Sequence, residues 1–135
     1  MAPFAKARVD VRFTTMQAMA AAETAVAKIL ETTHLAGTTT RQASRAAFLP
    51  LEQTSANRAL FEHYVACGRD LGLAIGGEYT GGSADSGYTS AIGAPTLCGT
   101  GPIGARAHTP DEVCELDSMP VRAKALALAI MRLAP

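Results

Sequence analysis

The stretch that decides the fold runs from Gly81 to Ser118 and reads GGSADSGYTSAIGAPTLCGTGPIGARAHTPDEVCELDS. It holds seven of the 12 glycines of the chain, and its polar residues do not fall on one periodic face. Loops that place Gly, Asp, His and Glu between apolar segments are where binding and catalytic groups concentrate. We therefore expect a functional site in this stretch, with His108 at its core.

The composition limits the classes of protein and partner. The chain has 135 residues, 48% of them hydrophobic and 18% charged, and a formal net charge of +0. This length and balance fit one ordinary folded domain or pieces of two. Without a Lys/Arg-rich run, and with only 5% aromatic residues, we expect neither nucleic acid nor a membrane as partner. The absence of a signal-like or membrane-spanning run predicts a cytoplasmic protein, and we expect its three cysteines to be reduced and at least half-buried.

The first fifty residues predict a strand, a helix and a second strand. Residues 5–13 alternate apolar and polar side chains, which is typical of a strand with one wet face. Residues 16–31 are rich in Ala and other helix formers, with Thr14 or Thr15 as a candidate N-cap. Residues 38–49 begin β-branched and then alternate, which favours a second strand. Such a βαβ unit has open sheet edges and needs more chain, or a partner, to be stable.

The remaining residues predict an α/β (α+β) arrangement. We expect helices over residues 55–71, ended by Gly72, and over a last segment capped by Ser118. A short helix should begin at an Asp85 cap and close at Gly93. Short strands are expected over residues 73–80 and 94–98.

Three places have residues suited to binding, and each has a plainer alternative. His108, followed by Asp111 and Glu112, is either a metal ligand or a loop histidine that makes only a hydrogen bond. Arg45 either clamps a carboxylate through both guanidinium nitrogens or is a solvated arginine. Gly81-Gly82 could present backbone N–H groups to an anion, or the helix start could simply be capped by Asp85.

Several of these pieces together resemble one enzyme family. They are the run from Gly81 to Gly93, then His108-Thr109-Pro110-Asp111-Glu112, then Glu115 and Asp117-Ser118 ahead of the last helix. The chain resembles the C-terminal part of the di-zinc exopeptidases of the glutamate carboxypeptidase, aminoacylase and acetylornithine deacetylase group. Residues 3–13 are similar to a strand of that family's lid, or dimerisation, domain, and Arg45-Ala46-Ala47-Phe48 is similar to its substrate-carboxylate segment.

The resemblance implies a division of the chain and roles for four residues. Residues 1–52 would be half of the lid domain, and residues 53–135 the C-terminal part of the catalytic domain. His108 would bind one zinc, Arg45 would hold the substrate's α-carboxylate, and Gly81 and Gly82 would shape the substrate side. The parent activity would be hydrolysis of an amide bond next to a free carboxylate in a small amino-acid or peptide-like substrate. One His fits zinc, cobalt or manganese equally well.

Two departures from the family pattern limit this expectation. Gly87 stands where the family often has Asn, and no H-x-D motif is present. The family's other metal ligands and its catalytic Glu lie in an N-terminal half that this sequence does not contain. We therefore expect a fragment that is inactive unless an N-terminal complement is supplied, with no catalytic residue of its own. The alternative is a non-catalytic binding or dimerisation module, with a homodimer formed through the lid segment.

Overall fold

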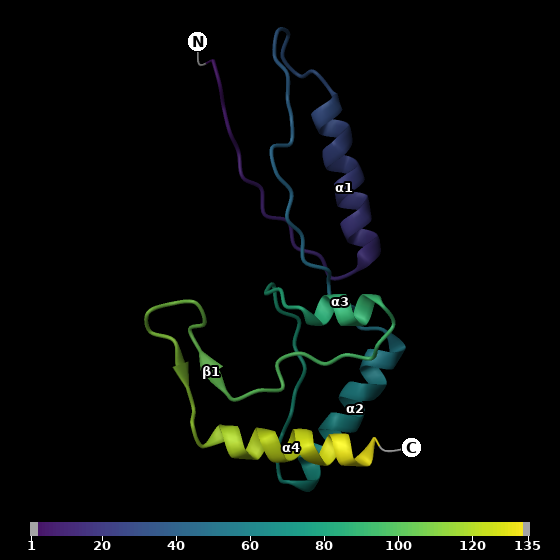
Figure 1. The fold of residues 1–135 in the computed structure, drawn as a ribbon, viewed down its shortest axis with the longest axis vertical. Coiled ribbons are helices and arrows are strands. Elements are labelled where there is room, and N and C mark those ends of the chain that lie inside the picture. Colours follow the sequence, from purple (N-terminus) through teal and green to yellow (C-terminus); the bar gives the residue numbers. More distant parts are fainter. Residues whose placement is uncertain (1–2, 134–135) are drawn as a thin grey trace.

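The structure, a computed structural model, describes residues 3–133 and contains four helices and one short sheet in that range (Figure 1). The helices are α1 (Met16–Glu31), α2 (Ser55–Asp70), α3 (Ser86–Ala91) and α4 (Ser118–Arg132). Two-residue strands β1 (Gly104–Ala105) and β2 (Val113–Cys114) pair antiparallel. This small mixed fold is consistent with an α/β domain. None of the described helices has the length and apolar character needed to cross a bilayer.

The core lies where α2 crosses α4. Ala125 and Ala129 of α4, four residues apart, face Tyr64 and Cys67 of α2, and all four side chains are buried. Small alanines on one face of α4 allow its backbone to approach α2 closely. Four partly buried apolar side chains pack around this cluster, namely those of Leu73, Ile75, Leu97 and Leu128. The chain before α3, through Leu73 and Ile75, and the chain after α3, through Leu97, therefore both pack against the pair formed by α2 and α4.

Asn57 is the buried polar residue that joins α2 to the segments around it. Its side-chain amide donates to the backbone oxygen of Glu52 at 2.7 Å and to the hydroxyl of Ser90 at 2.8 Å. Its carbonyl oxygen accepts from the backbone N–H of Thr96 at 2.7 Å. A buried amide with its donors and acceptor satisfied fixes the positions of its partners. Asn57 therefore sets the position of α3 and of residues 94–96 relative to α2.

Residues 3–49 form an open arm beside this unit. Figure 1 shows residues 3–15, α1 and the returning residues 32–49 projecting together from one end of the molecule. Met19 is the buried side chain in this part of the described chain. The whole chain exposes 10807 Å², whereas a compact monomer of 14.0 kDa exposes about 6,700 Å². The arm is thus far from burying the apolar surface that its sequence provides.

The helix predictions for the arm and for α2 are confirmed. Residues 16–31 form α1, and the hydroxyl of Thr15 caps it by accepting from the N–H of Ala18 at 3.0 Å. Helix α2 ends before Gly72, whose φ of +74° is the left-handed conformation that glycine adopts without strain. Its cap is Thr54, whose hydroxyl accepts from the N–H of Asn57.

The strand predictions are wrong at all four places. Residues 5–13, 38–49, 73–80 and 94–98 contain no strand. An alternating pattern makes a strand only when a neighbouring backbone completes a hydrogen-bonded ladder, and no backbone among residues 3–133 forms such a ladder with these segments. The expected βαβ unit is therefore a helix flanked by two unpaired segments. The sheet that does form lies within residues 104–114, where no strand was predicted.

Three smaller predictions are also corrected. Asp85 precedes α3 but makes no side-chain capping bond. Ser118 is the first residue of α4 rather than its cap, because its hydroxyl donates to the backbone oxygen of Glu115 and accepts from the N–H of Ile103. Cys67 is buried as expected, whereas Cys98 and Cys114 are exposed.

Replacing Asn57 with Ala should destabilise the helix pair. The change leaves the Thr96 N–H and the Glu52 carbonyl without their partner, which costs about 1–3 kcal/mol for each buried group that water cannot reach. Urea denaturation followed by circular dichroism measures the loss of unfolding free energy. Arg58→Ala, at the next, exposed position of α2, is the control and should change that energy by less than about 0.5 kcal/mol. An Asn57→Ala protein as stable as the control would contradict the role given to this amide.

Candidate functional site

His108 lies in the turn that joins β1 to β2. Its backbone has φ of 65°, and Arg106 two residues earlier has φ of 58°; both values are in the left-handed region that non-glycine residues rarely adopt. The carboxylate of Glu112 accepts from the His108 N–H at 3.0 Å, and Thr109 bonds back to the Arg106 carbonyl. The turn is therefore held by its own residues. The His108 side chain is exposed, and its ring makes no hydrogen bond to any residue from 3 to 133.

The residues around His108 do not fit a complete metal site. Across the described chain, no three His, Cys, Asp or Glu side chains converge as a metal ion requires. The carboxylate of Glu112, in the same turn, is engaged with the His108 backbone N–H. His108 is available to supply one ligand, and the remaining ligands would have to come from elsewhere.

Gly81 and Gly82 lie in the loop that leads into α3. The Gly81 carbonyl accepts a hydrogen bond from the guanidinium of Arg12, and the Gly82 N–H donates to the hydroxyl of Thr80 at 3.1 Å. A Cβ built on Gly81 would lie 2.7 Å from Arg12 Nη1, the end of a flexible side chain that can shift to make room for it. The Gly82 N–H is already used and the next helix has only six residues, so the loop is not a preformed anion site.

Arg45 forms an ion pair with Glu23 of α1. Both side chains are about half exposed, at 55% and 40%, so water competes with the pair and its contribution to stability is small. Arg45 is therefore solvated but also paired with a carboxylate of its own chain. A substrate carboxylate would have to displace Glu23 before it could take both nitrogens.

The structure does not join these residues into one site. Within residues 3–133, no hydrogen bond or ion pair links His108, Arg45 and the Gly81-Gly82 loop to each other. Each is held by a different neighbour: Glu112 in the turn, Glu23 on α1, and Arg12 in the arm. The three places have in common only that their residues are exposed to solvent.

Gly87, the position that departs from the family pattern, is a packing glycine. It is buried in α3, and a Cβ built on it would lie 2.7 Å from the carbonyl carbon of Leu49 and closer still to its oxygen. The Tyr88 hydroxyl donates to the Ala47 carbonyl at 3.0 Å, and the Tyr88 ring lies 6.1 Å from that of Phe48. Residues 47–49 therefore lie directly on α3. An Asn at position 87 would not fit this arrangement.

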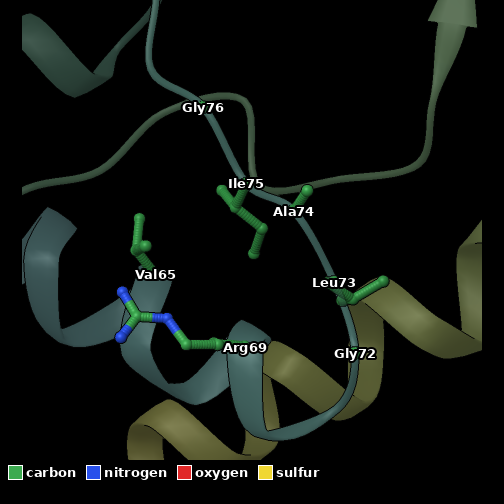
Figure 2. Close-up of a pocket in the computed structure, with 7 residues that line it drawn as sticks. All are labelled: Val65, Arg69, Gly72, Leu73, Ala74, Ile75 and Gly76. Atoms are coloured by element: carbon green, nitrogen blue, oxygen red, sulfur yellow. The ribbon is translucent and has the colours of Figure 1, made fainter.

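A second feature is an open cavity of about 660 Å³ between α2 and the segment that follows it (Figure 2). Figure 2 shows Val65 and Arg69 of α2 on one side and Ile75 and Gly76 on the other. Mostly apolar side chains and glycines line it: Val65, Arg69, Gly72, Leu73, Ala74, Ile75 and Gly76. It contains neither His108 nor Arg45, so it is separate from the residues expected to bind metal or substrate.

A cluster at the end of α4 joins a thiol to an imidazole and a guanidinium. Cys67 Sγ lies 3.9 Å from His63 Nε2 and 3.9 Å from Arg132 Nη1. His63 Nε2 donates to the Ala129 carbonyl at 2.9 Å, and Arg132 is 2.5 Å from Asp70. The hydrogen bond with Asp70, followed by that with Cys67, raises the pKa of Arg132 above its ordinary value. Because Cys67 is buried and each group has a partner, this cluster fastens α2 to α4.

Comparison with protein families identifies the class of the chain. Residues 43–132 match the model of peptidase family M20/M25/M40, which covers two thirds of the sequence. The chain belongs to this family, whose members are metallopeptidase-like hydrolases and generally metal-dependent. No curated protein and no solved structure matches it. The match includes Arg45, the Gly81-Gly82 loop and His108, and begins just before the end of the arm.

Asn57 and the cavity were missed by the sequence analysis. Asn57 precedes Tyr64 by seven residues, and Tyr64 precedes Gly68 by four, so all three lie on one face of α2. A polar residue on this otherwise apolar face was the signal in the sequence that could have identified Asn57. The cavity had no comparable signal. It results from an unpaired segment lying over a helix, and that placement depends on tertiary packing.

Gly87→Ala should disturb the contact between α3 and residues 47–49. The added methyl group meets backbone atoms of Leu49, which cannot move aside as a side chain can, so we expect a loss of about 1–3 kcal/mol. Thermal unfolding of the two variants Gly87→Ala and Gly82→Ala measures it. Gly82 is the matched control, because its Cβ would meet only Thr80 Oγ1, at an ordinary 3.4 Å. Equal melting temperatures for the two variants would contradict the close approach.

Proposed function

We propose that this chain is the C-terminal part of a metal-dependent hydrolase that cleaves an amide bond next to a free carboxylate. The observation on which the proposal chiefly depends is the placement of His108 within the family match. Its ring is exposed on a self-held turn and is not engaged by any described residue. A histidine in this position is free to ligate a metal ion whose other ligands are supplied by a second polypeptide segment.

The proposal assigns zinc as the metal and an N-terminal complement as the source of the missing ligands. Support comes from residues 3–133, in which no three His, Cys, Asp or Glu side chains are grouped as a metal ion requires. It also comes from the surface of 10807 Å², about 4,000 Å² more than a compact chain of this mass exposes. An excess of that size exceeds what one ordinary protein interface covers, and it suits a partner of domain size. In this proposal the chain by itself has no hydrolase activity.

Arg45 is proposed to bind the substrate carboxylate. A guanidinium presents two parallel N–H groups that match a carboxylate, and Arg45 already binds one in Glu23. Because that ion pair is half exposed, exchange of Glu23 for a substrate carboxylate costs little. Gly81 and Gly82 are proposed to border the substrate, since their loop lies in the family match and has no side chain to obstruct an approach.

His108→Ala tests the metal assignment. The chain is mixed with the N-terminal half of a full-length family member, and bound zinc and hydrolysis of N-acyl amino acids are measured for the mixture and for each part. We expect no activity from the chain alone, activity from the mixture, and loss of about one zinc per site with His108→Ala. His34→Ala, an exposed histidine of the arm, is the control. Restored activity that survives His108→Ala unchanged would show that the ligand is wrong.

The role of Arg45 is tested in the same mixture by comparing a substrate that has a free carboxylate with one that lacks it. Arg45→Ala should raise KM for an N-acyl amino acid at least about tenfold, because a charge-assisted hydrogen-bond pair contributes about 1.5–3 kcal/mol. The same variant should leave hydrolysis of the corresponding amino-acid amide, which lacks the carboxylate, unchanged. Equal losses on both substrates would mean that Arg45 acts through its ion pair with Glu23 alone.

A second candidate function is a non-catalytic dimerisation module. It is favoured by the arm, where the side chains of Phe4, Val9 and Leu35 are 76%, 76% and 64% exposed. Apolar groups so exposed on neighbouring segments are a common mark of an interaction surface. In this candidate a homodimer forms through residues 1–52, and the metal chemistry of the family is lost.

A further inference from the structure

Helix α4 has an apolar face that no other part of the described chain covers. Helix α2 packs on a different side of α4, and Figure 1 shows no second helix along it among residues 3–133. Apolar residues recur on the free side at intervals of three and four, which is one face of a helix. They form what we call the α4 stripe: Met119, Ala123, Leu126, Ala127, Ile130 and Leu133. All six are exposed, and the side chain of Ile130 is 61% exposed.

The stripe continues onto the β1–β2 hairpin at the start of α4. The Ile103 N–H donates to the Ser118 hydroxyl at 2.9 Å, which joins the hairpin to the first residue of the helix. Three apolar side chains of this region, those of Ile103, Val113 and Leu116, are 45%, 49% and 72% exposed. The turn of the same hairpin contains His108. A partner that lies along the stripe and the hairpin therefore comes close to the proposed metal ligand.

The charges beside the stripe indicate the kind of surface that would cover it. Helix α4 contains Arg122, Lys124 and Arg132 but no Asp or Glu. By helical geometry Arg122 and Lys124 lie on the two sides of the stripe, and neither forms an ion pair with any residue from 3 to 133. A second copy packed on the same stripe would place cations against cations, which is unfavourable. An apolar surface with carboxylates at its edge fits better.

The size of the exposed surface indicates the size of the partner. A stable protein interface takes about 20–30 residues a side, so the stripe and the hairpin residues are the centre of such an interface rather than all of it. The surface in excess of that of a compact chain, about 4,000 Å², has room for the rest. An apolar patch of this extent suits a folded polypeptide better than a small ligand. The N-terminal complement of the proposed function is a partner of this kind.

We infer that the N-terminal complement docks on the α4 stripe and the adjoining hairpin, through an apolar surface that has carboxylates opposite Arg122 and Lys124. The inference rests on the proposed function, because it takes the complement as the occupant. Docking along α4 brings the complement to the turn that holds His108, where its metal ligands are needed. The affinity comes from apolar burial on α4, so docking itself does not require a metal.

The test is titration calorimetry of the full chain with the N-terminal half of a full-length family member, in the presence of a metal chelator. The wild type should bind. Ile130→Lys replaces an apolar contact at the centre of the stripe with a charge and should raise the dissociation constant about 100-fold. Ala127→Lys should raise it about tenfold, because a smaller apolar group is lost. Ala66→Lys, the same change at an exposed position of α2, is the control and should leave it unchanged.

His108→Ala separates docking from the metal chemistry. This variant should bind the complement as the wild type does and lose only zinc, and circular dichroism checks that the helices of each variant are intact. Binding that depends on Ile130 without any hydrolysis by the mixture supports the docking surface and contradicts the hydrolase function.

Three results would overturn the docking surface. The first is a wild type that does not bind the complement, and the second is an Ile130→Lys chain that binds it normally, even with hydrolysis restored. The third is self-association, or binding to anionic lipid vesicles, that Ile130→Lys abolishes while binding to the complement persists. In that case a second copy or a membrane covers the stripe.

Discussion

The contact between α2 and α4 is the interaction on which the rest of the structure depends. Ala125 and Ala129 let the two helices approach, and Tyr64 and Cys67 fill the space between them. The hydrogen bonds of Asn57 then place α3 and residues 94–96 against α2. These contacts lie within residues 50–133, so they hold that part of the chain together as one packed unit. The arm shares little of this packing and is correspondingly open.

The same constraint explains why the expected site residues lie apart. The turn with His108 is joined to α4 through Ile103 and Ser118, while Arg45 is paired with α1 in the arm. No described element spans the distance between these two supports. A family that hydrolyses amide bonds with a metal needs its ligands and its substrate anchor in fixed relation. Additional chain that covers both supports would provide that relation, and the large exposed surface has room for it.

Much of the local structure was predictable from the residues, and the reason is physical. Helices α1 and α2 satisfy their own backbone hydrogen bonds, so their composition, their threonine caps and Gly72 fixed their bounds to within a residue. A strand needs a hydrogen-bonded partner strand, and the patterns in residues 5–13 and 38–49 could not reveal that no such partner is present among residues 3–133. The site residues were singled out by residue type and given their roles by resemblance, and the family match agrees with the class of enzyme that this resemblance implied.

The sequence by itself determined the family and the helices, and it predicted the site residues that the proposed function uses. Only the tertiary structure decided that Gly87 packs on Leu49, that Arg45 is paired with Glu23, and that Asn57 joins three segments. It also decided that the alternating residues 5–13 and 38–49 form no strand. These facts depend on residues far apart in the chain meeting in space. Spacing along one segment contains information about a helix, whose bonds are local, but not about contacts that other segments must complete.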